Sequence, residues 1–365
     1  MKSTEDTPSF LYHRAYKPIS LGCSNCPEKG LCGGLQTSGG QFDCLAFCEC
    51  KDPSTCQYVC PNNLDFMARI LDVSGFGFEN IPRVPKLTYP VLPRSVPLLY
   101  HAYRRKTPLN ADVVAVPLSY LINRKTGMLR FTSRAAIARH FGFAERSRLV
   151  ITGVAMDQPI EDYWSFRRAT RIPEQLSAIG PDLVTGPNYS TPLDTPKWEN
   201  LYNMKRIPIC WSELIAAGIP TSLHLNACTD RDWERWTEFV VKRREVVSVA
   251  YEFATGPARL ERGDWHAQKL VELAKAVPRR LQLIVRGGLV HLEKLNHAFG
   301  EVVFIDSTPF MKSVNRKKCV KSFGGKMEWL ASGTPRNHPI DSLLEHNVVA
   351  HARVISQVTA KQLTF

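Results

Sequence analysis

Short apolar runs alternate with amphipathic stretches along the chain from residue 111 onward. The apolar runs are rich in β-branched residues and are bounded by turn residues, a pattern that is typical of parallel strands buried on both faces. We predict eight such strands: Asp112–Leu118, Leu149–Met156, Asp182–Pro187, Thr221–Asn226, Val246–Phe253, Leu281–Val285, Val302–Ile305 and Val348–Ile355.

The intervening stretches carry their apolar residues three or four positions apart, as helices with one buried face do. We predict helices at Ser133–Phe141, Asp230–Arg243 and Asp264–Val277, with Asp264 as the cap of the last and Pro278 as its stop. Eight strand–helix units over about 250 residues predict an α/β fold of the (β/α)8, TIM-like barrel type. A doubly wound open sheet is the alternative, but no glycine-rich phosphate turn follows the first predicted strand.

Cysteines crowd the segment that precedes the predicted barrel. Eight of the 11 cysteines lie within it: Cys23, Cys26, Cys32, Cys44, Cys48, Cys50, Cys56 and Cys60. Little apolar material separates them, so we predict that a bound metal with a structural role replaces the missing core. Two four-thiolate zinc sites and an iron–sulfur cluster are the main alternatives, ahead of a disulfide framework.

The first three of these cysteines have the spacing Cys-x2-Cys-x5-Cys and are followed by Gly33 and Gly34. This pattern resembles the auxiliary-cluster segment of SPASM domains, which are attached to radical-SAM enzymes. Cys60 followed by Pro61 is similar to the Cys-Pro ending of ferredoxin cluster runs. The resemblance implies an iron–sulfur cluster, while zinc remains an alternative.

These patterns divide the chain into three parts. Residues 1–75 form a Cys-rich, metal-binding head, residues 76–110 form a Pro-rich basic connector, and residues 111–365 form the barrel. Six prolines in the connector favour an extended path over a helix. We expect the connector to pack as a strap on the barrel; the alternative is a path along a phosphate backbone.

The distribution of charge predicts a binding partner. The net charge is +13, from 47 Lys and Arg against 34 Asp and Glu, and much of it collects in short clusters such as Arg104-Arg105-Lys106 and Arg316-Lys317-Lys318. Clustered cations predict a nucleic-acid partner, DNA or RNA. No window of about 18 residues is apolar and uncharged, so no membrane span is expected. The N-terminus lacks the apolar core of a secretory signal, which favours a cytoplasmic location with reduced thiols. The sequence does not specify an oligomeric state.

Active sites of (β/α)8 barrels lie at the carboxyl ends of the strands. The polar residues at those ends are the candidate substrate-binding and catalytic groups: Ser119, Asp157, Gln158, Asn188, Tyr189, Asn226, Glu252, Arg286, Gly287, Gly288 and Asp306. Asp306 is the foremost candidate because it directly follows four apolar strand residues. His224 alternates with two leucines inside a strand, which favours a core histidine over a ligand.

The segment Leu281–Arg316 resembles the tRNA-guanine transglycosylase family, which includes relatives that insert 7-deazaguanines into DNA. Residues that fill places comparable to those of the family are Gly287, Gly288, Gly300, Asp306, Pro309, Lys312 and Arg316. The resemblance implies a base-exchange enzyme, a pentosyltransferase, in which Asp306 is the nucleophile and a modified purine base enters. Asp157 would then be the second catalytic carboxylate, and the paired glycines would let the flat base approach closely.

The cations that follow Asp306 would hold the phosphates that flank the target nucleotide. The candidate nucleic-acid-binding residues are Lys312, Arg316, Lys317 and Lys318, together with Arg104 and Arg105. The competing hypothesis is a non-catalytic nucleic-acid-binding or assembly protein with a metal-stabilised head. Metal-assisted phosphodiester hydrolysis is disfavoured, because the strand ends lack clustered His and Asp ligands.

Overall fold

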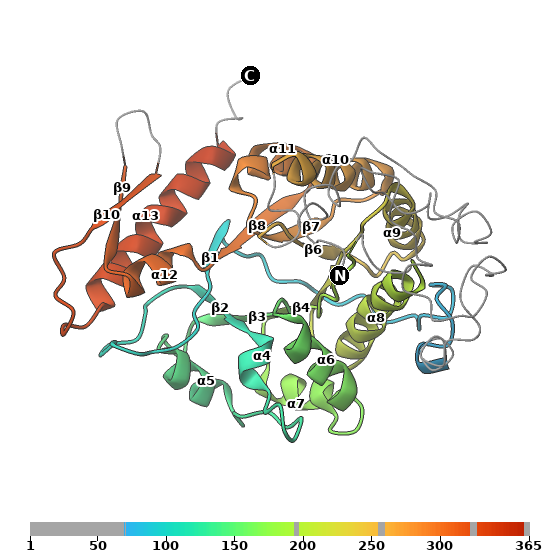
Figure 1. The fold of residues 1–365 in the computed structure, drawn as a ribbon, viewed down its shortest axis with the longest axis horizontal. Coiled ribbons are helices and arrows are strands. Elements are labelled where there is room, and N and C mark those ends of the chain that lie inside the picture. Colours follow the sequence, from blue (N-terminus) through green and yellow to red (C-terminus); the bar gives the residue numbers. More distant parts are fainter. Residues whose placement is uncertain (1–68, 70, 193–196, 255–259, 322–326, 361–365) are drawn as a thin grey trace, which may run out of the picture.

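Eight parallel strands form the centre of the computed structural model, which describes residues 69, 71–192, 197–254, 260–321 and 327–360 (Figure 1). The strands are β1 (Ser95–Pro97), β2 (Val113–Pro117), β3 (Arg148–Thr152), β4 (Leu183–Thr185), β5 (Thr221–His224), β6 (Ser248–Glu252), β7 (Gln282–Arg286) and β8 (Glu301–Asp306). Their order in the sheet is β1-β8-β7-β6-β5-β4-β3-β2. A parallel bridge between Leu98 and Ala115 brings β1 to β2, so the sheet is a nearly closed barrel and the predicted (β/α)8 fold is confirmed.

Two strand assignments need correction. The run Val348–Ile355 is not a strand; it lies inside helix α13 (Asp341–Ala360). Its buried residues include Leu344, His351 and Ile355, which recur at helical spacing rather than on alternate positions. The eighth strand is β1, which lies inside the range predicted as a connector. A strand of three residues that ends on a proline is too short to show an alternating pattern.

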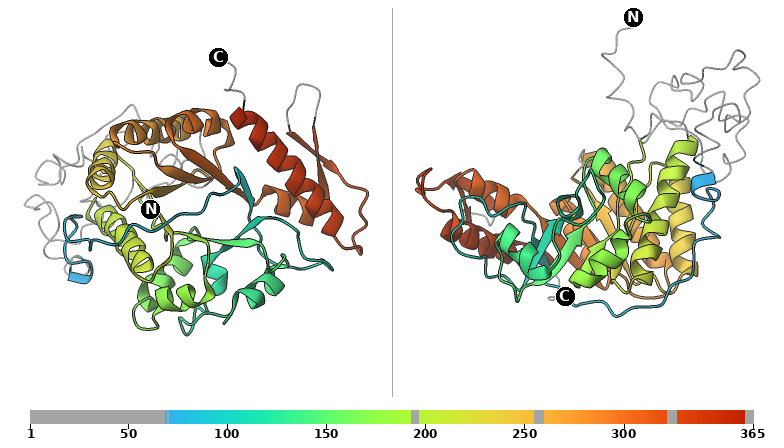
Figure 2. Two further views of the ribbon diagram at one scale, coloured as in Figure 1. Left: turned by 180° about the vertical axis from the view of Figure 1, so that it is seen from behind. Right: turned by 90° about the horizontal axis from the view of Figure 1, so that it is seen from below.

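Helices surround the barrel (Figure 2). In chain order they are α4 (Leu118–Leu121), α5 (Arg134–Phe141), α6 (Asp157–Phe166), α7 (Ile172–Ile179), α8 (Lys197–Ala216), α9 (Asp230–Lys242), α10 (Leu260–Ala276), the short η4 (Leu289–His291), α11 (Leu292–Ala298), α12 (Thr308–Val314) and α13. No helix in the described ranges is long and apolar enough to cross a membrane.

The predicted helix starts are partly confirmed. Ser133 caps α5 through a hydrogen bond from the backbone N–H of Ala136, and Thr229 caps α9 in a capping box. Helix α10 begins at Leu260, so Asp264 lies inside it and is not its cap. The carboxylate of Asp264 instead lies 3.3 Å from Nδ1 of His291.

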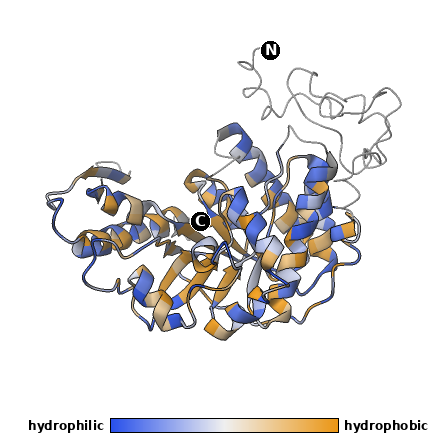
Figure 3. Ribbon diagram, turned by 60° about the horizontal axis from the view of Figure 1, so that its bottom comes forward, coloured by the Kyte–Doolittle hydropathy of each residue, from blue (hydrophilic) through white to orange (hydrophobic). Residues whose placement is uncertain are grey.

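The core has an inner and an outer part, because successive strand residues point to opposite faces of the sheet. One set fills the barrel: Val96, Leu98, Val113, Ala115, Val150, Leu183, Ala250, Ile284, Val303 and Ile305. The alternate set, which includes Val249, Leu283 and Phe304, packs against the helices. Figure 3 shows the apolar strands at the centre, with polar residues spread over the helices around them.

The segment before β1 crosses the amino-terminal end of the barrel. The hydroxyl of Tyr89 donates to the carbonyl of Thr221 at 2.7 Å, and Gln282 donates to the carbonyl of Pro90 at 3.2 Å. Farther back, the buried guanidinium of Arg243 donates to the carbonyls of Ile81 and Pro82. The segment therefore packs on the barrel as a strap and closes the end away from the expected active site.

An extension to the barrel follows β8. It consists of α12, the antiparallel hairpin of β9 (Lys317–Lys321) and β10 (Met327–Ala331), and α13. Asn347 of α13 is fully buried and fastens the hairpin: its side chain accepts from the N–H of Cys319 and donates to the carbonyl of Lys317, each at 2.8 Å. In Figure 1 the hairpin lies alongside α13 at the edge of the molecule.

Candidate active site at the carboxyl end of the barrel

Three charged side chains end three neighbouring strands. Glu252, Arg286 and Asp306 are the last residues of β6, β7 and β8. Glu252 pairs in register with Arg286, and Arg286 pairs with Ile305, the residue before Asp306. Parallel pairing therefore gathers two carboxylates and a guanidinium on one arc of the barrel mouth, as expected from the sequence.

The three side chains do not all point the same way. Glu252 and Arg286 share the alternation of Ala250 and Ile284, so they face the barrel axis. Asp306 alternates with the interior residue Ile305, and its carboxylate turns toward the helix layer, where it meets His351 of α13. Asp306 thus sits at the rim of the mouth, and Glu252 and Arg286 sit inside it.

Asp306 is held on both oxygens. Oδ1 accepts from the backbone N–H and from the hydroxyl of Thr308, each at 2.8 Å. Oδ2 lies 3.0 Å from Nε2 of His351, which is buried and stacks on Phe304. Burial alone would raise the pKa of Asp306, but the nearby imidazole of His351 and the two hydrogen bonds from Thr308 outweigh it and hold the pKa below its usual value. The carboxylate is therefore ionised while 17% of its side-chain surface remains exposed.

The pKa of Glu252 is shifted in the opposite direction to that of Asp306. Its side chain is only 2% exposed; Oε1 accepts from the N–H of Ala254 at 2.7 Å, and Oε2 lies 3.5 Å from Nη1 of Arg286. Burial raises the pKa of Glu252 to about 7, against the lowering influence of Arg286 and of the Ala254 hydrogen bond. The nearby charge of Asp306 adds to the rise. Glu252 can therefore hold a proton near neutral pH.

Arg286 links Glu252 to the segment that follows the first strand. Its Nη2 donates to the hydroxyl of Tyr100, which follows β1, at 3.2 Å. The guanidinium keeps about a quarter of its side-chain surface exposed, so it is the most accessible charge of the three. A pair of carboxylates whose pKa values are pushed apart, beside an accessible cation, suits a reaction that needs an ionised group and a proton carrier.

Gly287 and Gly288 have a role in packing. Both have positive φ angles, 72° and 68°, which favour glycine. A Cβ on Gly287 would lie 2.6 Å from the backbone nitrogen of Ala254, and one on Gly288 would lie 2.6 Å from the ring of Phe253. These glycines let the loop after β7 lie against the loop after β6, and that contact accounts for them without a bound base.

The remaining predicted residues gather at the ends of β3, β4 and β5, apart from the charged arc. Asn226 donates to Oδ1 of Asn188 at 3.0 Å and to the carbonyl of Tyr189 at 2.8 Å. Asp157 begins α6, is exposed, and accepts from the hydroxyl of Ser190 at 2.7 Å. Strands β1 and β2 separate the end of β3 from that of β8, so the structure does not bring Asp157 to Asp306.

Three other candidates turn away from the mouth or lie at its edge. The ring of Tyr189 is buried, with its hydroxyl 3.5 Å from the sulfur of Cys210 in α8. Gln158 is exposed and donates to Asp162 one helical turn later. Ser119 is half-buried in α4. His224 faces the barrel interior, where burial lowers its pKa to about 3, as expected of a core histidine.

The predicted nucleic-acid-binding cations divide into two groups. Arg105 and Arg316 stabilise the fold: Arg105 is buried and donates to the carbonyls of Phe141 and Gly142, and Arg316 donates to those of Arg336 and His338. Arg105 is therefore a correction, because its guanidinium is not available to a phosphate. Lys312 is half-buried, with its amine 5.9 Å from the ring centre of Trp329, whereas Arg104, Lys317 and Lys318 are exposed.

The eight cysteines predicted to bind metal lie outside the described residues, so their arrangement is not addressed by the structure. Within the described ranges, no group of three or more His, Cys, Asp or Glu side chains could hold a metal ion. The three described cysteines, Cys210, Cys228 and Cys319, are buried thiols.

Sequence reasoning missed His351, Tyr100 and Thr308. His351 was placed in a predicted strand, although the helical spacing of Leu344, His351 and Ile355 is the signal that could have located it. Tyr100 lies in the range predicted as a connector, and its position at the mouth follows only from the existence of β1. Thr308 follows Asp306 by two positions, the spacing at which an aspartate commonly accepts a backbone hydrogen bond.

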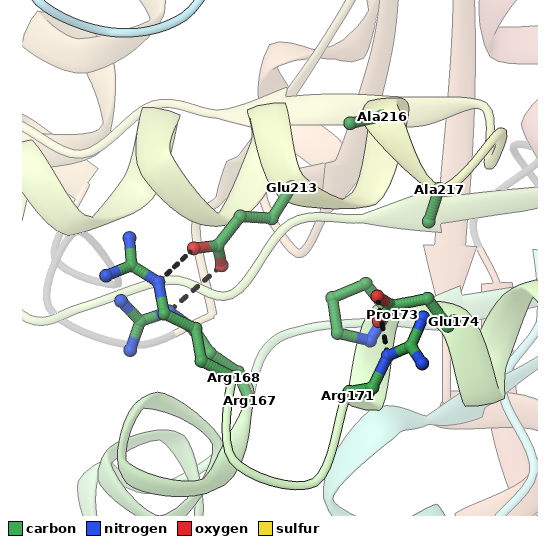
Figure 4. Close-up of a pocket in the computed structure, with 8 residues that line it drawn as sticks. All are labelled: Arg167, Arg168, Arg171, Pro173, Glu174, Glu213, Ala216 and Ala217. Carbon is green, nitrogen blue, oxygen red and sulfur yellow. Dashed lines mark hydrogen bonds and ion pairs between the residues drawn. The ribbon is translucent and has the colours of Figure 1, made fainter.

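A surface cavity elsewhere contains none of these residues. It lies between the turn that joins α6 to α7 and the end of α8 (Figure 4). Its arginines are paired with its acids: Arg167 and Arg168 each bond Glu213, and Arg171 bonds Glu174. The cavity is thus lined by ion pairs and is separate from the barrel mouth.

Comparison with models of protein families finds no match, and comparison with curated proteins finds none either.

Replacing Glu252 by Gln should flatten the dependence of stability on pH. The folded protein binds a proton at Glu252 up to about pH 7, whereas the unfolded chain releases it at the ordinary glutamate pKa of 4.5. The folded state therefore loses stability as pH rises through this window, by an amount on the order of 3 kcal/mol. Urea unfolding of the native protein and of Glu252→Gln between pH 5 and 8 measures the difference. Parallel curves for the two proteins would contradict the assignment.

Replacing His351 by Gln should make the protein more sensitive to acid. The depressed pKa of Asp306 contributes stability above its unfolded pKa, and that stability is lost as pH falls through the folded pKa. Without His351 the folded pKa rises, so acid unfolding followed by circular dichroism should begin at a higher pH. His338→Gln, at an exposed position, is the control. The double variant with Asp306→Asn should show a coupling free energy of about 0.5–3 kcal/mol; additivity would rule out the contact.

Proposed function

We propose that the protein is a base-exchange transglycosylase that replaces guanine in nucleic acid with a 7-deazaguanine. The observation that carries the proposal is Asp306, which stays ionised at the rim of the barrel mouth although most of its side chain is buried. An ionised carboxylate with restricted access to water is what a nucleophilic mechanism requires. The resemblance of Leu281–Arg316 to transglycosylases supplies the substrate class.

In the proposed first step an oxygen of Asp306 bonds to the anomeric carbon of the target nucleoside. The glycosidic carbon–nitrogen bond breaks, its electron pair leaves with the base, and the base takes a proton. In the second step a nitrogen of the entering base loses its proton and bonds to the same carbon. The ester bond to Asp306 breaks as this bond forms, and its electron pair returns to the oxygen, which regenerates the carboxylate.

Oδ2 is the better placed of the two nucleophile oxygens. Oδ1 already accepts two hydrogen bonds from Thr308, whereas the partner of Oδ2 among the described residues is His351 alone. A carboxylate oxygen has two lone pairs, so Oδ2 keeps one for bond formation. Exposure of the side chain leaves a route for the sugar to approach from the mouth.

Glu252 replaces Asp157 as the second carboxylate in this proposal. It holds a proton near neutral pH, so it can give one to the departing base and accept one from the entering base. Its neighbour Arg286 faces the axis and is accessible, so it can stabilise the negative charge that develops on the departing base. Asp157 lies on the far arc with Ser190 and is assigned no step.

The cysteine-rich head is proposed to bind zinc or an iron–sulfur cluster with a structural role, on the strength of cysteine spacing alone. No step of the reaction is routed through it. Metal analysis and a visible spectrum of protein purified without oxygen decide between the alternatives, because zinc is colourless and an iron–sulfur cluster absorbs visible light. Protein that folds with neither metal nor sulfide would refute metal binding.

The decisive test compares Asp306→Asn with Asp157→Asn. Incubation with guanine-containing DNA or RNA and a labelled 7-deazaguanine measures exchange, and denaturing gels detect the covalent adduct. Asp306→Asn should lower kcat/KM by about 10³-fold or more and abolish the adduct while binding persists. The reason is that the neutral amide of Asn cannot replace the negatively charged carboxylate as nucleophile. Asp157→Asn should retain activity within about tenfold. A fully active Asp306→Asn protein would refute the enzyme hypothesis and favour the non-catalytic nucleic-acid-binding alternative.

A further inference from the structure

Nearly half of the net charge of the protein lies in the extension after β8. Residues 308–340 contain seven Lys and Arg and one acid, Glu328, which gives +6 of the total +13 in 33 of the 365 residues. Such concentration on one segment differs from the scattered charge that merely keeps a protein soluble. The extension is therefore a surface to which a polyanion would be drawn.

The cationic hairpin is fixed at its base. Asn347 and His346 of α13 bond the backbone of Lys317 and Cys319, and Cys319 is buried between them. Arg316, at the start of β9, donates to the carbonyls of Arg336 and His338 in the loop after β10. The two strands thus form a ribbon whose position relative to the barrel is fixed, as a docking element requires.

The ribbon presents exposed cations beside apolar surface. Lys317 and Lys318 are exposed on β9, and Lys318 pairs in register with Leu330 of β10, which is 54% exposed. The loop after β1 continues the surface. Ile340 donates its N–H to the carbonyl of Arg104 at 2.9 Å, and the guanidinium of Arg104 lies over the ring of Tyr103, itself 66% exposed. Figures 1 and 2 show this loop and the hairpin at the same end of the molecule.

The geometry points to a docking surface for double-stranded DNA, made by Tyr103, Arg104, Lys106, Lys317, Lys318 and Leu330. A two-stranded antiparallel ribbon fits the major groove of B-form DNA, whereas the major groove of an RNA helix is too narrow to admit it. The exposed cations would contact phosphates on either side of the groove, and Leu330 would contact the thymine methyl groups or sugars inside it.

This inference rests on the proposed function for its nucleic-acid partner, and it narrows that partner to duplex DNA. The surface lies on the loop after β1 and on the extension after β8, so DNA bound there flanks the carboxyl end of the barrel. The target nucleotide would then leave the helix to reach the mouth.

The test is the affinity of the full-length protein for a fluorescent DNA duplex as a function of salt. Lys317→Ala/Lys318→Ala removes two phosphate contacts, each of which contributes about 0.9 to the slope of log affinity against log salt. We expect the slope to fall by about 2 and binding at about 0.15 M salt to weaken about thirtyfold. Lys242→Ala/Arg244→Ala, two exposed cations at the end of α9, is the matched control and should change neither.

Duplex RNA and single-stranded DNA of the same sequence complete the experiment. The inference predicts that the hairpin variant loses affinity for duplex DNA and that the native protein binds duplex DNA more tightly than the other two ligands. It is overturned if the native protein prefers single-stranded DNA or duplex RNA, or if the control variant weakens binding equally.

Activity separates this inference from the proposed reaction. Normal DNA binding by the hairpin variant together with base exchange by the native protein would refute the docking surface and leave the proposed reaction standing. Weakened binding without any base exchange would sink the reaction alone. Asp306→Asn should bind the duplex as tightly as the native protein.

Discussion

Closure of the parallel sheet is the constraint on which the rest of the structure depends. It relies on β1, a strand of three residues that pairs with β8 and is followed by Leu98, which bridges to Ala115 of β2. Once the ring is closed, the alternation of side chains decides which residues fill the axis and which meet the helices. The same alternation sets the side-chain directions in the candidate site, where Glu252 and Arg286 face the barrel axis and Asp306 faces the helices.

Electrostatics at the mouth follow from that division. An inward carboxylate is surrounded by barrel residues, so burial dominates and Glu252 favours its protonated form. An outward carboxylate at the same level can meet a helix, and Asp306 finds His351 and the start of α12, which favour its ionised form. The pKa values of Glu252 and Asp306 are thus shifted in opposite directions, although only β7 separates their strands.

Much of the fold could be predicted from the sequence, and the reasons are local. Seven strands are short runs between turn residues, most of them rich in Val, Ile and Leu, and each was placed within a few residues. Strand β1 could not be found in this way, because its three residues carry too little pattern. The run Val348–Ile355 was misassigned, because its valines and isoleucine fit a strand or a helix equally well over eight residues.

The sequence could place the candidate residues at strand ends, but it could not give their side-chain contacts. Placing Asp306, Arg286 and Glu252 at the mouth required only the strand ends, whereas the direction of each side chain and the partner His351 depend on tertiary contacts. The same limit applies to Arg105 and Arg316, whose positive charge indicated a ligand but whose guanidinium groups bind the backbone of the protein itself. The sequence shows that a residue is charged, but it does not show whether the charge binds the protein's own backbone or an external ligand.

The pairing of Asp306 with His351 also has a consequence for the order in which the protein matures. The two residues are 45 positions apart, and α12, the hairpin and the first half of α13 lie between them. A nascent chain that has completed all eight strands therefore still lacks the group that keeps Asp306 ionised. The barrel strands can therefore be complete during synthesis before Asp306 gains the partner that lowers its pKa.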